Sequence, residues 1–183
     1  SGYIRPNAEL AEEYRITNLR LFADYIYLDT EERKQFSTMR HEYLIEQTQF
    51  NGTTPYIKGQ NIVKFNMDFN HPVKEIFWVV QNDKVFESND LFNFSHTVDN
   101  QATPLDPITS AQMFINGTDR FPERTAKYFR HVQPYFYHTR VPNKHIYSYS
   151  FGLRPEEHQP TGTCNFSRLN TSELQLDFLD TLP

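Results

Sequence analysis

The sequence predicts an all-β domain built as an antiparallel β-sandwich, and three observations support this fold class. Aromatic residues make up 15% of the 183 residues, including 16 Phe and 11 Tyr, and such side chains favour pleated, half-buried surfaces. Eleven Pro residues supply the turns that a chain of short strands needs. Strand patterns also follow one another without the strand–helix alternation of a parallel sheet. A chain of this length is sufficient for one domain with its own core.

The first half of the sequence combines strand patterns with one short helix signal. Alternating or continuous apolar character predicts strands at residues 19–29, 41–50, 62–69 and 76–80. The last of these, Ile76–Val80, is apolar throughout, which indicates a strand covered on both faces. Between the first two strands, Asp29 or Thr30 can cap a helix whose first turn contains Glu31 and Glu32.

The second half begins after a long polar connection at residues 82–107, a length that is uncommon in compact domains. Further strands are predicted at residues 111–115, 146–153 and 163–178. The first of these ends at the Asn116–Gly117 turn signal. Pro122 is placed for the first turn of a helix that runs to about His131, and Pro134 would stop it.

Charge and cysteine content exclude several classes of protein. The net charge is −5, whereas nucleic-acid binding calls for a clustered basic face. The single Cys164 excludes a disulfide framework within one chain and fits a reducing compartment. No apolar run approaches the roughly 18 residues of a membrane span. We therefore expect neither a nucleic-acid partner nor direct insertion into a membrane.

Four segments together carry a family signature: Asp24–Arg33, His41–Gln47, Asn70–Glu75 and Tyr149–Arg168. They resemble, in the same order, the C-terminal half of the major capsid proteins of nucleocytoplasmic large DNA viruses, of the phycodnavirus, mimivirus and iridovirus kind. The resemblance covers most of the chain. The Tyr149–Arg168 segment is the most distinctive of the four.

The resemblance implies a jelly-roll β-sandwich with two short helices in its connections, as the second half of a double jelly roll. Residues 1–18 would be a linker or entry segment, and residues 19–183 the jelly-roll capsid domain. Against the family pattern, the first jelly roll and the final strand of the second are absent. We therefore expect the domain to be incomplete at its C-terminus, with the edge of its first strand unpaired.

The function that the resemblance implies is structural. A major capsid protein of this kind trimerises into pseudo-hexagonal capsomers, which tile an icosahedral shell around an internal membrane. Its partners would be two further copies in a homotrimer, neighbouring capsomers and minor capsid proteins, in a virion assembled in the host cytoplasm. The chain would be no enzyme and would need no cofactor. The candidates for burial in trimer contacts are Ile76–Val80 and Tyr128–Tyr137, and Trp78 is expected to be almost fully buried.

No residue is assigned a catalytic, cofactor-binding or metal-binding role. His131 and His138 lack the spacing of metal ligands on a helix. Cys164 alternates with Phe166 in a strand pattern, which favours a small core residue over a nucleophile. The carboxylate pairs Glu31–Glu32 and Glu156–Glu157 are adjacent in sequence, so their side chains point apart and suit a helix start and a charged turn. We interpret Arg154–Pro160 as a rigid connection that its two prolines stiffen.

Two alternatives and one modification remain open. A jelly-roll lectin would stack sugars on exposed aromatic side chains such as Tyr135, Phe136 and Tyr137, and a cupin-type enzyme would need a His/Glu metal set on neighbouring strands. Five Asn-x-Ser/Thr sequons occur, at Asn51, Asn93, Asn116, Asn165 and Asn170. We favour turn and ladder chemistry for these asparagines over glycosylation, although glycans stay possible.

Overall fold

The computed structural model describes residues 17–57, 59–87, 90–96 and 105–179. The described residues fall into two compact units, a first one at residues 17–46 and a second one from Gln47 onward, and the boundary expected at residues 18 and 19 stays a prediction. In the described part of that first unit the one regular element is α1, Thr30–Thr38. The Asp29 carboxylate caps α1 by accepting a hydrogen bond from the Glu32 N–H at 2.8 Å. The predicted helix and its cap are thus confirmed.

The strands predicted at residues 19–29 and 41–50 are wrong for this structure, which forms no strand there. Both segments are open chain, and apolar side chains such as Leu21 are exposed. Alternation specifies two faces of a strand, but only a hydrogen-bonded partner makes it part of a sheet. Near the end of the second segment, a side-chain amide makes the backbone hydrogen bonds that a neighbouring strand would otherwise make. Gln49 donates to the Asn70 carbonyl at 2.6 Å and accepts from the Asn70 N–H at 2.9 Å.

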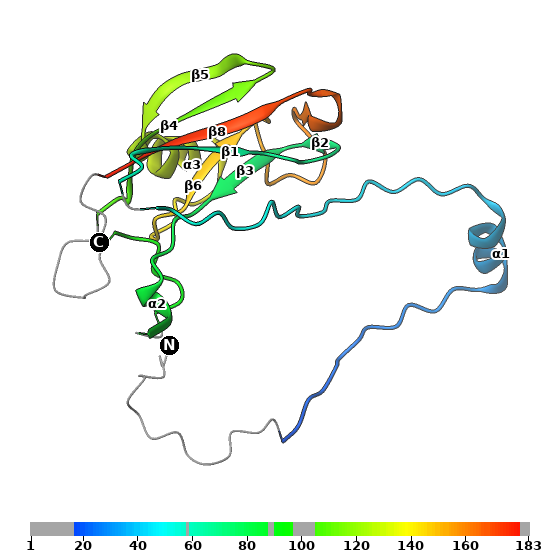
Figure 1. Ribbon diagram of the computed structural model, residues 1–183. Helices are drawn as coiled ribbons and strands as arrows, with labels where there is room; N and C mark the ends of the chain where they lie inside the picture. Colours follow the sequence, from blue (N-terminus) through cyan, green and yellow to red (C-terminus); the bar gives the residue numbers. More distant parts are fainter. Residues whose placement is uncertain (1–16, 58, 88–89, 97–104, 180–183) are drawn as a thin grey trace. The chain divides into compact units, whose positions relative to one another are not determined.

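The second unit is formed by antiparallel strands in three small sheets (Figure 1). The largest has the order β1-β8-β4-β5, with bounds Ile62–Asn66, Ser172–Phe178, Ile108–Ile115 and Thr118–Thr125. The other two pair β3 with β6, at Glu75–Trp78 and Tyr147–Ser150, and β2 with β7, at Pro72–Val73 and Cys164–Asn165. Every one of these pairings is antiparallel, as the composition predicts.

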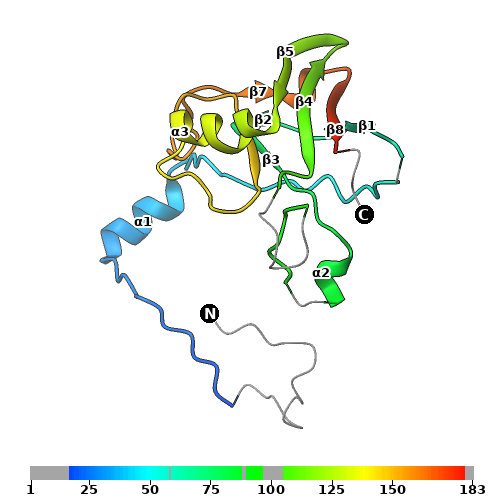
Figure 2. The same ribbon diagram turned by 90° about the vertical axis from the view of Figure 1, so that its left-hand side faces the viewer.

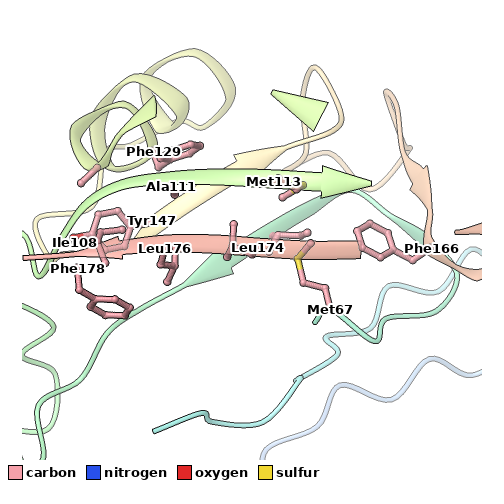
Figure 3. Packing of buried hydrophobic residues seen from close by; sticks show 12 residues of the cluster. Met67, Ile108, Ala111, Met113, Phe129, Tyr147, Phe166, Leu174, Leu176 and Phe178 are labelled. Atoms are coloured by element: carbon pink, nitrogen blue, oxygen red, sulfur yellow. The ribbon is translucent and has the colours of Figure 1, made fainter. Parts of the chain in front are cut away.

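A single apolar core joins these sheets (Figure 3). On β8, the residues at every second position, Leu174, Leu176 and Phe178, are buried, which is the period of a strand with one covered face. The predicted inward residues of the segment at 62–69 also join this core. Buried residues of the core come from β3, β4, β6, β8 and the helical segment after β5. The order of polar and apolar residues along each strand therefore decides which face is covered.

The helix predicted from Pro122 to about His131 begins later than expected. Pro122 lies inside β5, which pairs with β4 through the turn at Asn116 and Gly117. This position tolerates proline because β5 is the outer strand of its sheet and needs no ladder donor on its free side. The helical segment comprises a π-helical turn, η1 at Tyr128–Val132, followed directly by α3 at Gln133–Tyr137. Pro134 does not stop the helix: it lies in the first turn of α3, where its missing N–H costs nothing.

Two further short helices lie in connections. Helix α2, Lys84–Glu87, interrupts the long polar segment predicted at residues 82–107. The 3-10 turn η2, Phe166–Arg168, follows β7 and begins at Asn165, whose side chain accepts from the Ser167 N–H at 3.1 Å. No helix among the described residues is both long enough and apolar enough to cross a bilayer.

Candidate assembly surfaces

An apolar groove of about 810 Å³ opens between the four-stranded sheet and the sheet of β3 and β6. Phe65 of β1 and Leu176 of β8 line one side, and Ile76 and Trp78 of β3 line the other. Strand β1 is an outer strand of its sheet, and the Asn51 side chain donates to its Asn66 carbonyl. Trp78 is only partly buried, less than expected, because it faces this groove.

Strand β3 presents apolar side chains on both of its faces. Ile76 is buried in the core, whereas Phe77 is 53% exposed and Val79 is exposed on the opposite face. Coverage of both faces, which we expect from a neighbouring subunit, stays a prediction, because the chain alone leaves Phe77 and Val79 exposed. Exposed apolar side chains on an ordered strand and directly after it are typical of a surface that another protein covers.

The helical segment η1–α3 exposes a second apolar surface. Gln133 and Pro134 are buried against β6, and the next two residues point outward: Tyr135 is 74% exposed and Phe136 is 70% exposed. Their rings form an edge-to-face pair with centroids 5.4 Å apart. Val132 precedes Phe136 by four residues and is also exposed, so the three side chains share one helix face.

A polar cluster around Asp106 holds this helical segment in place. One Asp106 carboxylate oxygen accepts from the Arg130 guanidinium at 3.1 Å and from the Tyr147 hydroxyl at 2.9 Å. Burial first, and then the Asp106 carboxylate, raises the pKa of Tyr147, so the hydroxyl stays a donor. His145 is buried nearby, with Nε2 3.9 Å from the same carboxylate oxygen. Burial, followed by the Arg130 charge, lowers the pKa of His145.

Two more contacts fix α3 over β6 and β3. The buried Gln133 side chain accepts from the Ser150 N–H at 3.2 Å and donates to the Tyr128 hydroxyl at 3.0 Å. At the other end of α3, His138 Nε2 lies 2.7 Å from a Glu75 carboxylate oxygen. Because hydrogen bonds hold both ends of the helix, its exposed aromatic residues are preorganised in the chain without a partner.

Local contacts hold the distinctive segment between β6 and β7, which we predict to be a rigid connection. Glu156 accepts hydrogen bonds from the Thr139 N–H at 3.0 Å and the Thr139 hydroxyl at 3.3 Å. Arg154 pairs with Glu157 at 3.0 Å. At the base of the connection the backbone of Gly152 approaches that of Gly162 so closely that a Cβ on Gly152 would lie 2.8 Å from the Gly162 carbonyl oxygen. The two glutamates thus serve local ion pairs and hydrogen bonds.

The remaining candidate residues are dispersed. His131 is exposed on η1, and His138 is engaged by Glu75. Glu31 and Glu32 lie in the first turn of α1, where they complement the helix dipole. Cys164 is partly buried in β7, and burial raises the pKa of its thiol. Among the described residues, no three His, Cys, Asp or Glu side chains gather in a way that could hold a metal ion.

Four of the five sequon asparagines use their side chains locally. The Asn116 side chain accepts from the Asn170 N–H at 2.8 Å and the Thr171 N–H at 3.3 Å. Asn51 accepts from the Asp68 N–H at 3.2 Å and donates to the Asn66 carbonyl. Asn93 and Asn165 each accept from the backbone two residues ahead. This is the turn and ladder chemistry that we favoured for these residues.

Comparison with known proteins identifies the family. The family model for the large eukaryotic DNA virus major capsid protein matches residues 32–183. The chain belongs to this family. The resemblance seen in the sequence is therefore confirmed on a segment that includes every described strand.

Individual relatives agree with this assignment. The chain is 39% identical over 186 residues to the major capsid protein of Pyramimonas orientalis virus, with 88% of this chain and 42% of that protein covered. It is 36% identical over 182 residues to the probable capsid protein 4 of Acanthamoeba polyphaga mimivirus, with 96% and 35% covered. The chain thus spans less than half the length of these curated relatives.

The fold is shared as well. The PBCV-1 virus capsid structure matches 84% of this chain and 43% of its own, with a TM-score of 0.68 at 35% identity. The Faustovirus major capsid protein matches in fold alone, with a TM-score of 0.55 at 14% identity over 64% of this chain and 28% of its own. The predicted jelly-roll sandwich is confirmed, and the share of the relatives that is covered fits one half of a double jelly roll.

Proposed function

We propose that the chain is a structural building block of a viral shell, in which it trimerises into pseudo-hexagonal capsomers of an icosahedral capsid. The match to the PBCV-1 capsid in both sequence and fold along 84% of the chain carries this proposal. Its partners would be further copies of itself, neighbouring capsomers and minor capsid proteins. It would act in the virion after assembly in the host cytoplasm, and residues 19–183 would form its jelly-roll domain behind a linker at residues 1–18.

The surfaces of the second unit suit such a role. Large apolar side chains are exposed on β3, on α3 and along the groove, and they are held by strands and by a fixed helix rather than by free loops. Rigid aromatic residues on ordered elements are typical anchors of protein–protein interfaces. In this proposal the chain works by packing against other proteins, without catalysis and without a bound cofactor or metal.

Assembly of the purified protein tests the proposal. We expect sedimentation velocity to show trimers, and electron microscopy of particles from infected cells to place antibodies against this chain on the outer shell. A protein that stays monomeric at all accessible concentrations, together with virions that lack the chain, would rule the proposal out. Turnover of a glycan or ester that is lost in Glu157→Gln would instead establish an enzyme.

A further inference from the structure

The charge of the chain is strongly segregated. Residues 124–155 contain six of its 18 basic residues and none of its 23 acidic residues. The rest of the chain therefore carries 12 basic against 23 acidic residues. Within the chain, Arg130 pairs with Asp106 and Arg154 with Glu157, whereas Lys127 and Arg140 are exposed, where an acidic surface of another copy can reach them.

The basic segment includes the helix that exposes the aromatic pair. Lys127 and His131 are exposed on the N-terminal side of Tyr135 and Phe136, and Arg140 is exposed just beyond the end of α3. In contrast, Arg130 is neutralised within the chain by Asp106. The helix surface thus combines a central aromatic pair with exposed basic side chains around it, the arrangement of a protein–protein hot spot.

A surface of opposite character surrounds α2. Among the side chains that the structure describes there, Asp83 is exposed and Asp90 is partly buried, and Lys84 is the basic one. The same connection exposes Phe86 and Phe92, each to 63%. Val85 is fully buried, and the Gln81 side chain donates to the Leu91 carbonyl at 2.8 Å, so this connection is anchored to the fold.

These two surfaces lie on different sides of the second unit. Helix α2 contributes Lys84 and Phe86 to the lining of the apolar groove. Helix α3 packs on β6, where the Ser150 N–H bonds to Gln133. Figure 2 shows α2 below the strands and α3 beside them. One copy therefore uses α3 and its neighbour uses α2, a head-to-tail contact of the type that closes into rings or extends into lattices.

We propose that the basic aromatic surface on α3, formed by Lys127, His131, Tyr135, Phe136 and Arg140, docks on the acidic aromatic surface around α2 of a second copy. This inference rests on the proposed function and names the contact by which copies meet. The aromatic residues exclude water at the centre of the contact. The opposite charges around them fix the register, and like charges repel one another when two α3 surfaces or two α2 surfaces meet.

A charge swap tests the contact in the purified chain, with the self-association constant measured by sedimentation equilibrium. Lys127→Glu with Arg140→Glu reverses the first surface, and Asp83→Lys with Asp90→Lys reverses the second. We expect each pair alone to weaken self-association by at least about tenfold, because like charges then face one another. All four substitutions together should restore it to within about threefold of the wild type. Arg168→Glu with Lys34→Glu makes the same change in net charge elsewhere and should leave self-association unchanged.

Each other outcome overturns the contact. If the wild type self-associates but neither pair weakens it, or if the fourfold variant is not restored, the α3–α2 contact is wrong while the capsid proposal stands. If the wild type does not self-associate, the α3–α2 contact is wrong, and the capsid proposal falls with it only if virions also lack the chain. The α3 surface would instead bind a membrane if the wild type bound phosphatidylserine vesicles and Lys127→Glu with Arg140→Glu abolished this binding while self-association stayed intact. Circular dichroism checks folding, and Phe136→Ser with Phe92→Ser provides uncharged variants that should also weaken self-association about tenfold.

Discussion

At the scale of single residues, Asp106 organises the most polar part of the interior. Its carboxylate accepts from Arg130 and Tyr147 and lies beside His145, three residues that come from η1, from β6 and from the chain just before β6. A charge of this kind is tolerated in a partly buried position because one carboxylate oxygen accepts hydrogen bonds from both Arg130 and Tyr147. Its removal would leave the Arg130 guanidinium without its carboxylate.

We expect Asp106→Asn to lower the free energy of unfolding by about 2–3 kcal/mol, since breaking one partner of a buried ion pair costs more than breaking an exposed one. Urea denaturation followed by the fluorescence of Trp78, the single tryptophan, measures this change. Tyr147→Phe removes one hydrogen bond and leaves the ion pair, so it should cost less. Equal effects of the two substitutions would contradict the ion-pair argument.

The same cluster should make stability depend on pH. Burial and then Arg130 lower the pKa of His145, Asp106 opposes them, and His131 and Lys144 add to the lowering. The unfolded chain therefore takes up a proton near pH 6.5 that the folded chain takes up only at lower pH. The stabilising contribution of neutral His145 is present above pH 6.5 and is lost as the pH falls from there through the folded pKa. The melting temperature of His145→Gln should fall less than that of the wild type between pH 7.5 and 5.5; parallel curves would count against this assignment.

At the scale of elements, the connection between β6 and β7 depends on two glycines that touch. Gly162 has a φ of +143°, a region that favours glycine, and Gly152 has no room for a Cβ because the Gly162 carbonyl lies in its way. Glu156 and Arg154 then tie the outer part of the connection to its surroundings. The connection is rigid because its base is closed as well as because Pro155 and Pro160 stiffen it.

Gly152→Ala should therefore destabilise the protein by about 2–3 kcal/mol through overpacking against backbone that cannot easily move. The matched control is Gly117→Ala, where the added Cβ meets open space and only the positive φ of 75° is strained. That control should cost about 1 kcal/mol. Thermal unfolding of the two variants gives the comparison, and a larger loss in Gly117→Ala would refute the close-approach argument.

At the scale of the whole molecule, one core holds two sheets together while large apolar side chains stay exposed outside it. Leu176 of β8 is buried between β1 and β4 and contributes to the shared core. On the neighbouring strand β1, Ile62 is 60% exposed. The chain thus separates residues that stabilise the fold from apolar residues that are available to other proteins.

Leu176→Ala should lower the free energy of unfolding by about 3 kcal/mol, the usual cost of a cavity in a packed core. Ile62→Ala removes a side chain of similar size from an exposed position and should cost less than about 1 kcal/mol. Urea denaturation of both variants checks the difference. If Leu176→Ala were as mild as Ile62→Ala, the core at this point would not be closed in solution.

The sequence by itself determined the all-β class, the turn at Asn116 and Gly117, a helix start at Asp29 or Thr30 and the family, because each depends on local residue types or on an ordered set of motifs. Only the tertiary structure decided the rest. The alternation at residues 19–29 predicts a strand, but this segment pairs with no other strand in the structure. Pro122 predicts a helix start, but pairing with β4 places it in strand β5. The cluster around Asp106 joins residues 24 to 41 positions apart, so no local pattern indicates it. Local preferences are properties of short segments, whereas strand pairing and buried charge depend on which distant segments meet.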